Sequence, residues 1–283
     1  MKVVYKSSTK PTWCPGCGDY GVVASVERAL SSLQVPPHEV VVVGGIGCSS
    51  NLPHFLSSYG FHGLHGRAMP VAEGVKLANH GLHVIVTGGD GDGWGIGLGH
   101  ALHAMRRNLD LTYIVMDNEI YGLTTGQASP TSTMGQKTKS TPQGVIEEPV
   151  NPISLSLAAG ATYVARGFSG DPKQLSDLIA GGIKHRGFAL IDVFSPCVTY
   201  NPLNTFDFFR QRLYKLDSAG HDPSDLVKAH AKALEWGDRI PTGLFYRVER
   251  PTYEELEPAL KPGPLVHQKA GLQGKDKVLD EFV

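Results

Sequence analysis

Several features are scarce in this chain of 283 residues, and each scarcity excludes a class of protein. Lysine and arginine number 26 against 27 aspartates and glutamates, a net charge of −1, so no charge excess predicts binding to nucleic acid or an anionic membrane. No apolar run approaches the roughly 18 residues of a membrane-spanning helix. The twelve histidines are scattered, without the HExxH spacing of a zinc-binding helix. We therefore expect neither nucleic acid nor a membrane among the partners.

Cysteine is scarce as well, with four residues in the whole chain. The first residues show no signal-peptide pattern. We therefore expect a cytoplasmic location, where cysteines stay reduced and disulfides are rare.

Apolar runs alternate with helical patterns over the first 200 residues, which predicts an α/β fold with a doubly wound, mostly parallel sheet. The strands are expected at 39–43, 83–87, 111–116, 161–166 and 188–194. The helices are expected at 19–33, 70–80, 97–108, 152–159 and 171–185. We assign residues 1–205 to this domain. Residues 206–283, with helical patches at 225–236 and 253–260 but little apolar density, are expected to be an extension that packs on a partner subunit.

An aspartate and an asparagine follow two consecutive expected strands. Asp90 lies in the glycine-rich segment GGDGDGWGIG, and Asn118 comes 28 residues later, about one βαβ crossover. In a parallel sheet both side chains would emerge at the carboxyl edge, where open α/β sheets bind ligands. Mg²⁺ prefers carboxylate, amide and carbonyl oxygens and retains phosphate oxygens. The layout predicts a magnesium–diphosphate site, and it resembles the GDG…N signature of thiamine diphosphate enzymes.

The glycine-rich segment has two other interpretations. The glycines alone would also fit a tight strand-to-helix turn. A dinucleotide-binding fold would need an acidic residue roughly 20 residues beyond the glycines. Asp117 could be mistaken for that residue. The aspartate within the glycines and the NEIYG loop that begins at Asn118 favour thiamine diphosphate.

The cysteines occupy positions that the fold would bring together. Cys14 and Cys17 form the compact element WCPGCG before a helical pattern, whereas Cys48 and Cys197 each follow an apolar run that reads as a buried strand. Four thiolates beside a thiamine site indicate one 4Fe–4S cluster. The alternatives are a thioredoxin-like pair, which lacks a preceding strand, and a Cys₄ zinc site, which usually has two CxxC knuckles rather than one.

Between residues 10 and 210 the chain is similar to the β subunits of 2-oxoacid:ferredoxin oxidoreductases, because it carries a set of their motifs in the same order. The motifs are WCPGCGDYGV, GIGCSSNLP, HGRAMPVAEGVKLAN, GDGDGWGIG, NEIYGLTTGQASPT and PCVTYNP. One departure is Thr125, where many relatives carry lysine, and it puts in doubt any carry-over of substrate contacts from this loop.

The resemblance implies specific roles for residues around the cofactors. Mg²⁺ would be bound by Asp90, Asn118 and the carbonyl of Ile120, with Asp92 as the competing aspartate. Leu123 and Thr125 would lie on the thiazolium side, and no side chain is assigned to the chemical step itself. His65 could instead belong to a structural turn. The cofactor-lining residues would be Ile46, Gly47, Cys48, Ser49, His65, Gly91, Asp92, Gly122 and Leu123.

The resemblance also implies partners and a reaction. An α subunit would supply the second thiamine-binding module in an α2β2 heterotetramer, coenzyme A would be the co-substrate, and an external ferredoxin would accept the electrons. We expect 2-oxoglutarate as the 2-oxoacid, with pyruvate or a broad range of 2-oxoacids as the alternative. The other possible functions are a thiamine-dependent decarboxylase or carboligase without redox chemistry, and a zinc-binding assembly subunit.

Overall fold

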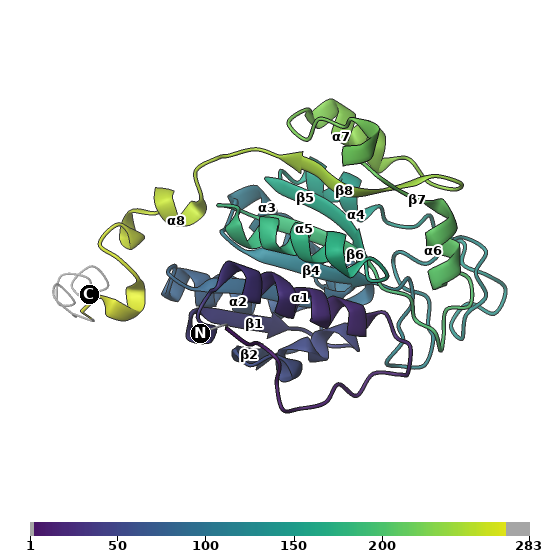
Figure 1. Cartoon of the computed structure of the whole chain (residues 1–283), viewed down its shortest axis with the longest axis horizontal. Helices are drawn as coiled ribbons and strands as arrows, with labels where there is room; N and C mark the ends of the chain where they lie inside the picture. The colour runs from purple at the N-terminus through teal and green to yellow at the C-terminus, as the bar shows by residue number, and fades with distance from the viewer. Residues whose placement is uncertain (1–2, 270–283) are drawn as a thin grey trace, which may run out of the picture.

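Eight strands form one sheet in the computed structural model, which describes residues 3–269 (Figure 1). The strand order is β2-β1-β3-β4-β6-β5-β8-β7, and neighbouring strands run parallel except for the antiparallel pair β5 and β8. This arrangement confirms the predicted doubly wound, mostly parallel α/β fold. The strands are β1 (Val40–Gly44), β2 (Tyr59–His62), β3 (His83–Gly89), β4 (Thr112–Asp117), β5 (Tyr163–Phe168), β6 (Ala189–Phe194), β7 (Leu213–Lys215) and β8 (Ile240–Arg247).

Helices cover both faces of the sheet because alternate residues of each strand point to opposite sides. In β4, Ile114 and Met116 face one core, and Tyr113 and Val115 face the other. The first core lies under α1 (Asp19–Leu33) and α5 (Pro172–Lys184), which lie in front of the sheet in Figure 1. The second core lies under α2 (Ala68–Ala78), α3 (Leu98–Arg107) and α4 (Pro152–Ala158). Every residue of β4 is buried, as expected for a central strand covered on both faces.

The extension contributes more to the sheet than the sequence predicted. It forms α6 (Phe206–Arg212), β7, α7 (Leu226–Ala233) and β8 before α8 (Tyr253–Leu256). Our expectation of a core-poor extension is therefore wrong for residues 206–247. Its apolar residues are few, but they converge: Phe209 stacks on Phe194 with ring centroids 4.3 Å apart, and Phe245 is fully buried. The sequence also did not reveal β2, whose four residues are all exposed at the edge of the sheet.

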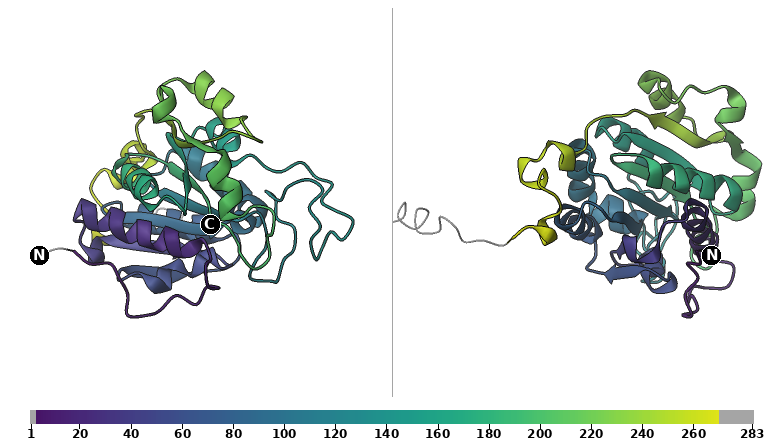
Figure 2. Two further views of the ribbon diagram at one scale, coloured as in Figure 1. Left: turned by 45° about the vertical axis from the view of Figure 1, so that its right-hand side comes forward. Right: turned by 60° about the vertical axis from the view of Figure 1, so that its left-hand side comes forward.

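The functional loops gather where the parallel strands end, on the right in Figure 1. The segment between β4 and α4 projects beyond this edge as a long loop (Figure 2, left). None of the helices within residues 3–269 is long and apolar enough to cross a membrane. Short helical segments complete the structure: η1 (Pro37–Glu39), η2 (Ser49–Phe55), η3 (Gly91–Ile96), η4 (Asp217–Ala219), η5 (Pro258–Leu260) and η6 (Leu265–His267).

Candidate active site at the carboxyl edge of the sheet

Asp90 follows β3 directly, and the structure buries its carboxylate beneath the loop after β4. Oδ2 of Asp90 accepts a hydrogen bond from the Thr131 hydroxyl at 2.7 Å, and the same hydroxyl oxygen lies 2.8 Å from Oδ1 of Asp117. Burial raises the pKa of Asp90, while hydrogen bonds from Ser129, Thr131 and the N–H of Asn118 lower it. A buried carboxylate without a cation is unfavourable, so this position is suited to a bound metal ion.

Asn118 follows β4 and lies beside Asp90, as the crossover length predicted. Its N–H hydrogen-bonds to Asp90, and its side-chain oxygen accepts from the N–H of Ile120 at 3.1 Å. The Asn118 carbonyl accepts from Nδ2 of Asn201 at 3.0 Å, which ties the loop to the segment after Cys197. The main chain of Asn118 thus contacts the Asp90 carboxylate, and carboxylate and amide oxygens are ligands that Mg²⁺ prefers.

Asp92, the competing aspartate, has a different role in the structure. Its Oδ1 accepts three hydrogen bonds: from the N–H of Ile46 at 2.9 Å, from Nδ1 of His65 at 2.8 Å and from the N–H of Gly66 at 2.8 Å. Gly45 has no room for a side chain, because an ideal Cβ there would lie 2.2 Å from the Asp92 carboxylate. Asp92 therefore fixes the loops after β1 and before α2 around the π-helical segment η3.

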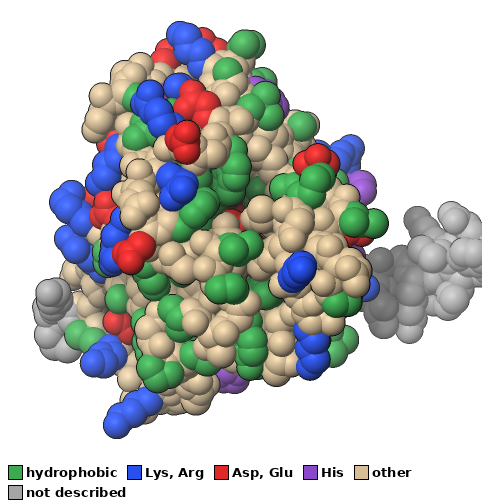
Figure 3. Space-filling view, turned by 90° about the vertical axis from the view of Figure 1, so that its right-hand side faces the viewer, with side chains coloured by type: hydrophobic (Ala, Val, Ile, Leu, Met, Phe, Trp, Pro, Cys, Tyr) green, Lys and Arg blue, Asp and Glu red, His purple; other side chains and the backbone are tan. Residues whose placement is uncertain are grey.

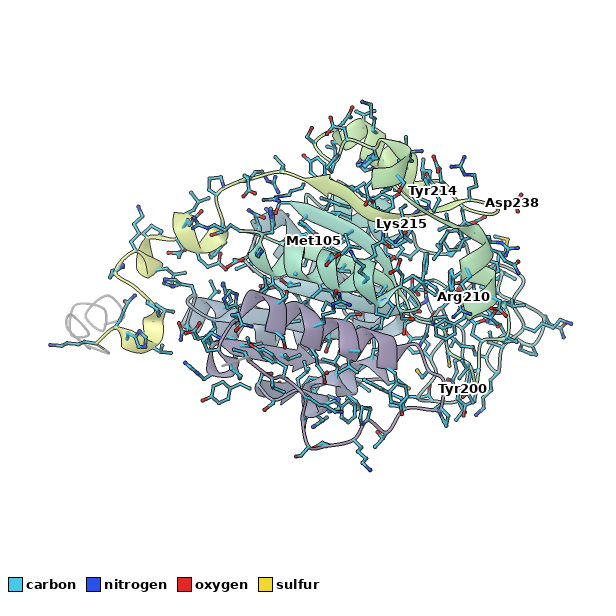
Figure 4. All side chains as sticks on the ribbon, in the orientation of Figure 1. Met105, Tyr200, Arg210, Tyr214, Lys215 and Asp238 are labelled. Carbon is cyan, nitrogen blue, oxygen red and sulfur yellow. The ribbon has the colours of Figure 1, made fainter. Side chains whose placement is uncertain are left out.

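Residues 121–127 form a narrow loop over this site. The Tyr121 hydroxyl donates to the carbonyl of Gly91 at 3.0 Å, so the loop is anchored on the glycine-rich segment. Leu123 and Thr125 are exposed at its tip, and Ile46 is exposed across the site, whereas Ser49 is buried. Tyr200 lies at the same end of the molecule (Figure 4), and an ideal Cβ on Gly126 would be 3.4 Å from its ring.

The four cysteines are free and surround the same edge. Cys14 is exposed, and the other three are partly buried. An ideal Cβ on Gly122 would lie 3.4 Å from Sγ of Cys197, 3.9 Å from Sγ of Cys48 and 4.0 Å from Nδ2 of Asn118. The thiol sulfurs and the candidate magnesium ligand therefore flank one glycine.

Cys17 and Cys48 lie in surroundings that disfavour a free thiolate. Burial, followed by the charge of Asp19, raises the pKa of Cys48 to about 11 and raises that of Cys17 further. Within residues 3–269, no three His, Cys, Asp or Glu side chains converge tightly enough to bind a single ion. A structural zinc needs four ligands within about 2.3 Å of one ion, whereas a 4Fe–4S cluster takes its cysteines on separate irons.

A second group of buried charges lies behind Asp117. Burial raises the pKa of Glu119 to about 8 and the pKa of Asp192 to about 6. Nε of Arg166 lies 3.2 Å from Asp192, and the positive charge of this guanidinium lowers the pKa of Asp192 in opposition to burial. A cavity of about 260 Å³ opens beside Glu119 and Arg166. Arg166 and Asp192 thus form a buried ion pair behind Asp117, and the raised pKa keeps Glu119 largely protonated near neutral pH.

Sequence reasoning missed several residues that shape the site. Thr131 and Asn201 lie in polar segments whose composition marks a loop but not which side chain points inward. Ser195 Oγ donates a hydrogen bond to Asp19 Oδ1 at 2.7 Å. Asp19 lies two residues after Cys17, and Ser195 lies two residues before Cys197, so this bond joins the two cysteine-containing segments. Nothing in the spacing of these residues indicated that contact. Beyond the NEIYGLTTGQASPT motif, the polar sequence of this loop carried no signal that would have singled out Thr131 as a contact of Asp90.

Comparisons with known proteins agree with the motifs. Residues 38–193 match the thiamine pyrophosphate enzyme C-terminal TPP-binding domain, and residues 197–262 match the C-terminal region of the pyruvate ferredoxin oxidoreductase β chain. The 2-oxoacid:ferredoxin oxidoreductase β subunit of Saccharolobus solfataricus is 47% identical, over 93% of this chain and 92% of the relative. The 2-oxoglutarate synthase subunit KorB of Methanocaldococcus jannaschii is 38% identical, over 90% and 94%.

A solved structure shows the same fold. The 2-oxoglutarate:ferredoxin oxidoreductase of Magnetococcus marinus, which has 2-oxoglutarate, coenzyme A and succinyl-CoA bound, matches with a TM-score of 0.91 and 42% identity. The match covers 97% of this chain and 94% of that one. The chain thus belongs to the β subunits of the 2-oxoacid:ferredoxin oxidoreductases, enzymes that work with an α subunit.

Proposed function

We propose that this subunit acts in the coenzyme A-dependent oxidative decarboxylation of 2-oxoglutarate to succinyl-CoA and CO₂, with ferredoxin as the electron acceptor. The observation that carries the proposal is the position of Gly122, because Sγ of Cys197, Sγ of Cys48 and Nδ2 of Asn118 all lie within 4.0 Å of an ideal Cβ on this residue. A thiamine site and a redox centre at this spacing suit an oxidative reaction. The 2-oxoglutarate enzymes among the relatives support the choice of substrate.

Asp90, Asn118 and the carbonyl of Ile120 would hold Mg²⁺ against the diphosphate of thiamine diphosphate. Gly91 and Gly122 would let the backbone approach the diphosphate, and Asp92 would keep the surrounding loops in place through its three hydrogen bonds. The remaining residues proposed to line the cofactor are Ile46, Gly47, Cys48, Ser49, His65 and Leu123, with Thr125 farther along the loop.

His65 is oriented for a contact with the cofactor. Because Nδ1 of His65 lies 2.8 Å from the Asp92 carboxylate, Nδ1 carries a ring proton, and this hydrogen bond fixes the orientation of the ring. The ring is packed edge-on against Tyr121, with centroids 6.0 Å apart, which restricts its rotation.

Cys14, Cys17, Cys48 and Cys197 would hold one 4Fe–4S cluster. When bound, thiamine diphosphate supplies an electron sink for decarboxylation, and the cluster passes single electrons onward. The exposed side of Cys14 would be nearest to an external ferredoxin, because the other three cysteines are partly buried. An α2β2 assembly would supply the second thiamine-binding module and the coenzyme A contacts.

Two measurements test the proposal. Protein purified without oxygen should be brown and carry about four irons per chain; one zinc and no iron would reject the redox mechanism. The enzyme reconstituted with its α subunit should reduce a viologen dye only with both 2-oxoglutarate and coenzyme A. A tenfold preference for pyruvate in kcat/KM would reject 2-oxoglutarate as the principal substrate, and dye-independent decarboxylation would indicate a decarboxylase instead.

A further inference from the structure

The tip of the 121–127 loop is held in a defined shape. The N–H of Tyr121 donates to Gln127 O at 2.9 Å, the N–H of Gly126 donates to Tyr121 O at 2.9 Å, and the N–H of Thr125 donates to Gly122 O at 3.0 Å. These three bonds close the loop on itself. The side chains of Leu123 and Thr125 are therefore displayed at its tip rather than packed beneath it.

Thr125 has an unusual backbone conformation. Its φ is +77°, a region that β-branched residues rarely adopt because Cβ crowds the backbone. Such strain persists where the surrounding structure imposes it, and it is concentrated at ligand-binding sites. In this conformation the Thr125 hydroxyl accepts a hydrogen bond from the ammonium group of Lys139 at 2.8 Å.

Lys139 is fixed beside the tip by its own backbone. Its N–H donates to Gly126 O at 2.9 Å, and the next residue, Ser140, accepts a hydrogen bond from the N–H of Ala128 at 3.0 Å. The long loop after Asn118 thus folds back onto the tip in a set register. The main-chain bond from Lys139 and the bond to the Ser140 hydroxyl thus place the Lys139 backbone beside the tip, within reach of Thr125.

The ammonium of Lys139 has no anionic partner among the described residues, since no carboxylate of residues 3–269 lies within 4.0 Å of it. It has three N–H donors, and Thr125 takes one of them. Figure 3 looks onto this edge of the molecule, where isolated lysine or arginine side chains stand among uncharged atoms. An unpaired cation at the tip of the active-site loop is suited to an anionic group of a ligand.

We propose that Lys139 is a specificity-determining residue that binds the second carboxylate of a dicarboxylic 2-oxoacid such as 2-oxoglutarate, with Thr125 holding its ammonium in place. The inference rests on the proposed function, because the loop tip is expected on the thiazolium side of the cofactor. A monocarboxylic 2-oxoacid such as pyruvate has no group for this cation. Lys139 therefore favours the longer, doubly charged substrate.

The test uses the holoenzyme reconstituted with its α subunit and compares Lys139→Met with Lys137→Met. Lys137 is a matched control, because it is an exposed lysine of the same loop without a hydrogen bond or ion pair from its side chain among the described residues. The readout is kcat/KM for 2-oxoglutarate and for pyruvate, measured by viologen reduction. Lys139→Met should lower the value for 2-oxoglutarate at least tenfold, about 1.4 kcal/mol, mainly through KM.

Lys139→Met should change kcat/KM for pyruvate less than twofold. Lys137→Met should change kcat/KM for either substrate by no more than twofold. Lys139→Arg should retain most of the activity with 2-oxoglutarate. An equal fall for both substrates in Lys139→Met would show that the lysine only shapes the loop, and no fall would show that it is not involved; either overturns the inference. A native enzyme that oxidises neither substrate would reject the proposed function itself.

Discussion

The carboxylate of Asp92 accepts a hydrogen bond from Nδ1 of His65 at 2.8 Å, and this contact joins two loops that are 27 residues apart in sequence. The same oxygen serves the N–H groups of Ile46 and Gly66. Asp92 thus joins the loops after β1 and before α2, whereas the hydrogen bonds to Asp90 come from Ser129, Thr131 and the N–H of Asn118, all in the segment after β4. The two aspartates of the GDGD segment have different roles, one structural and the other suited to a metal ion.

Asp90→Ala and Asp92→Ala should therefore fail in different ways. Asp90→Ala should abolish retention of thiamine diphosphate and Mg²⁺ while changing the free energy of unfolding less than Asp92→Ala does, because the loss of its hydrogen bonds is offset by the removal of a buried charge. Asp92→Ala should lower the free energy of unfolding by about 2 kcal/mol or more, since it leaves the buried N–H of Gly66 without a partner. Cofactor content and denaturant unfolding of each apoprotein measure the two effects. Loss of cofactor only in Asp92→Ala would mean that the metal ligand is Asp92.

The Asp19–Ser195 hydrogen bond should stabilise a bound cluster by holding the Cys17 and Cys197 segments together. Ser195→Ala leaves a buried oxygen of Asp19 without its donor, which costs about 1–3 kcal/mol. We expect at least tenfold faster release of iron to a chelator. Ser156→Ala is the control, because it removes an equally buried hydroxyl, bonded to the carbonyl of Pro152, far from the cysteines. Equal release rates in the two variants would contradict a positioning role.

Asn108 should be among the most sensitive positions for stability. Its Nδ2 donates to the carbonyls of Arg250 and Pro251, and its Oδ1 accepts from the N–H of Phe188 and the hydroxyl of Thr162. Removing these bonds in Asn108→Ala should lower the free energy of unfolding by about 3 kcal/mol. Denaturant unfolding measures the change.

Two companion variants separate the causes of that loss. Asn108 has a φ of +54°, which glycine tolerates, so Asn108→Gly should still lose about 2 kcal/mol from the missing hydrogen bonds. Asn79→Ala removes one exposed bond, from the N–H of Gly81, and should change stability by no more than about 0.5 kcal/mol. Native stability in Asn108→Gly would show that strain, not hydrogen bonding, explains the alanine variant.

His185 should contribute a loss of stability in mild acid. Burial lowers its pKa in the folded state, while Nε2 hydrogen-bonds to Thr162 Oγ1 at 2.8 Å. As pH falls through the unfolded value of about 6.5, unfolded chains bind a proton that the folded protein does not bind at that position. The free energy of unfolding should therefore decline more steeply below pH 6.5 in the native protein than in His185→Gln. Parallel pH curves for the two proteins would reject this assignment.

The amino-acid sequence by itself determined the fold class, the position of the central strands along the chain and which polar residues follow those strands. Asp90 and Asn118 each follow a buried apolar run, and parallel strands deliver the residues after them to one edge. Local patterns and one topological rule were sufficient for that step. The cysteines followed from the same rule, because Cys48 and Cys197 also stand just beyond strands.

Only the tertiary structure decided which side chains contact one another across long separations. Thr131 reaches Asp90 from 41 residues away, and Lys139 reaches Thr125 from within a polar loop that has no periodic pattern. The strands of the extension were hidden for a related reason, since Ile240 and Phe245 are buried by residues far from them in sequence. Periodicity encodes the face that an element buries, but a contact between two irregular loops depends on how the whole chain packs.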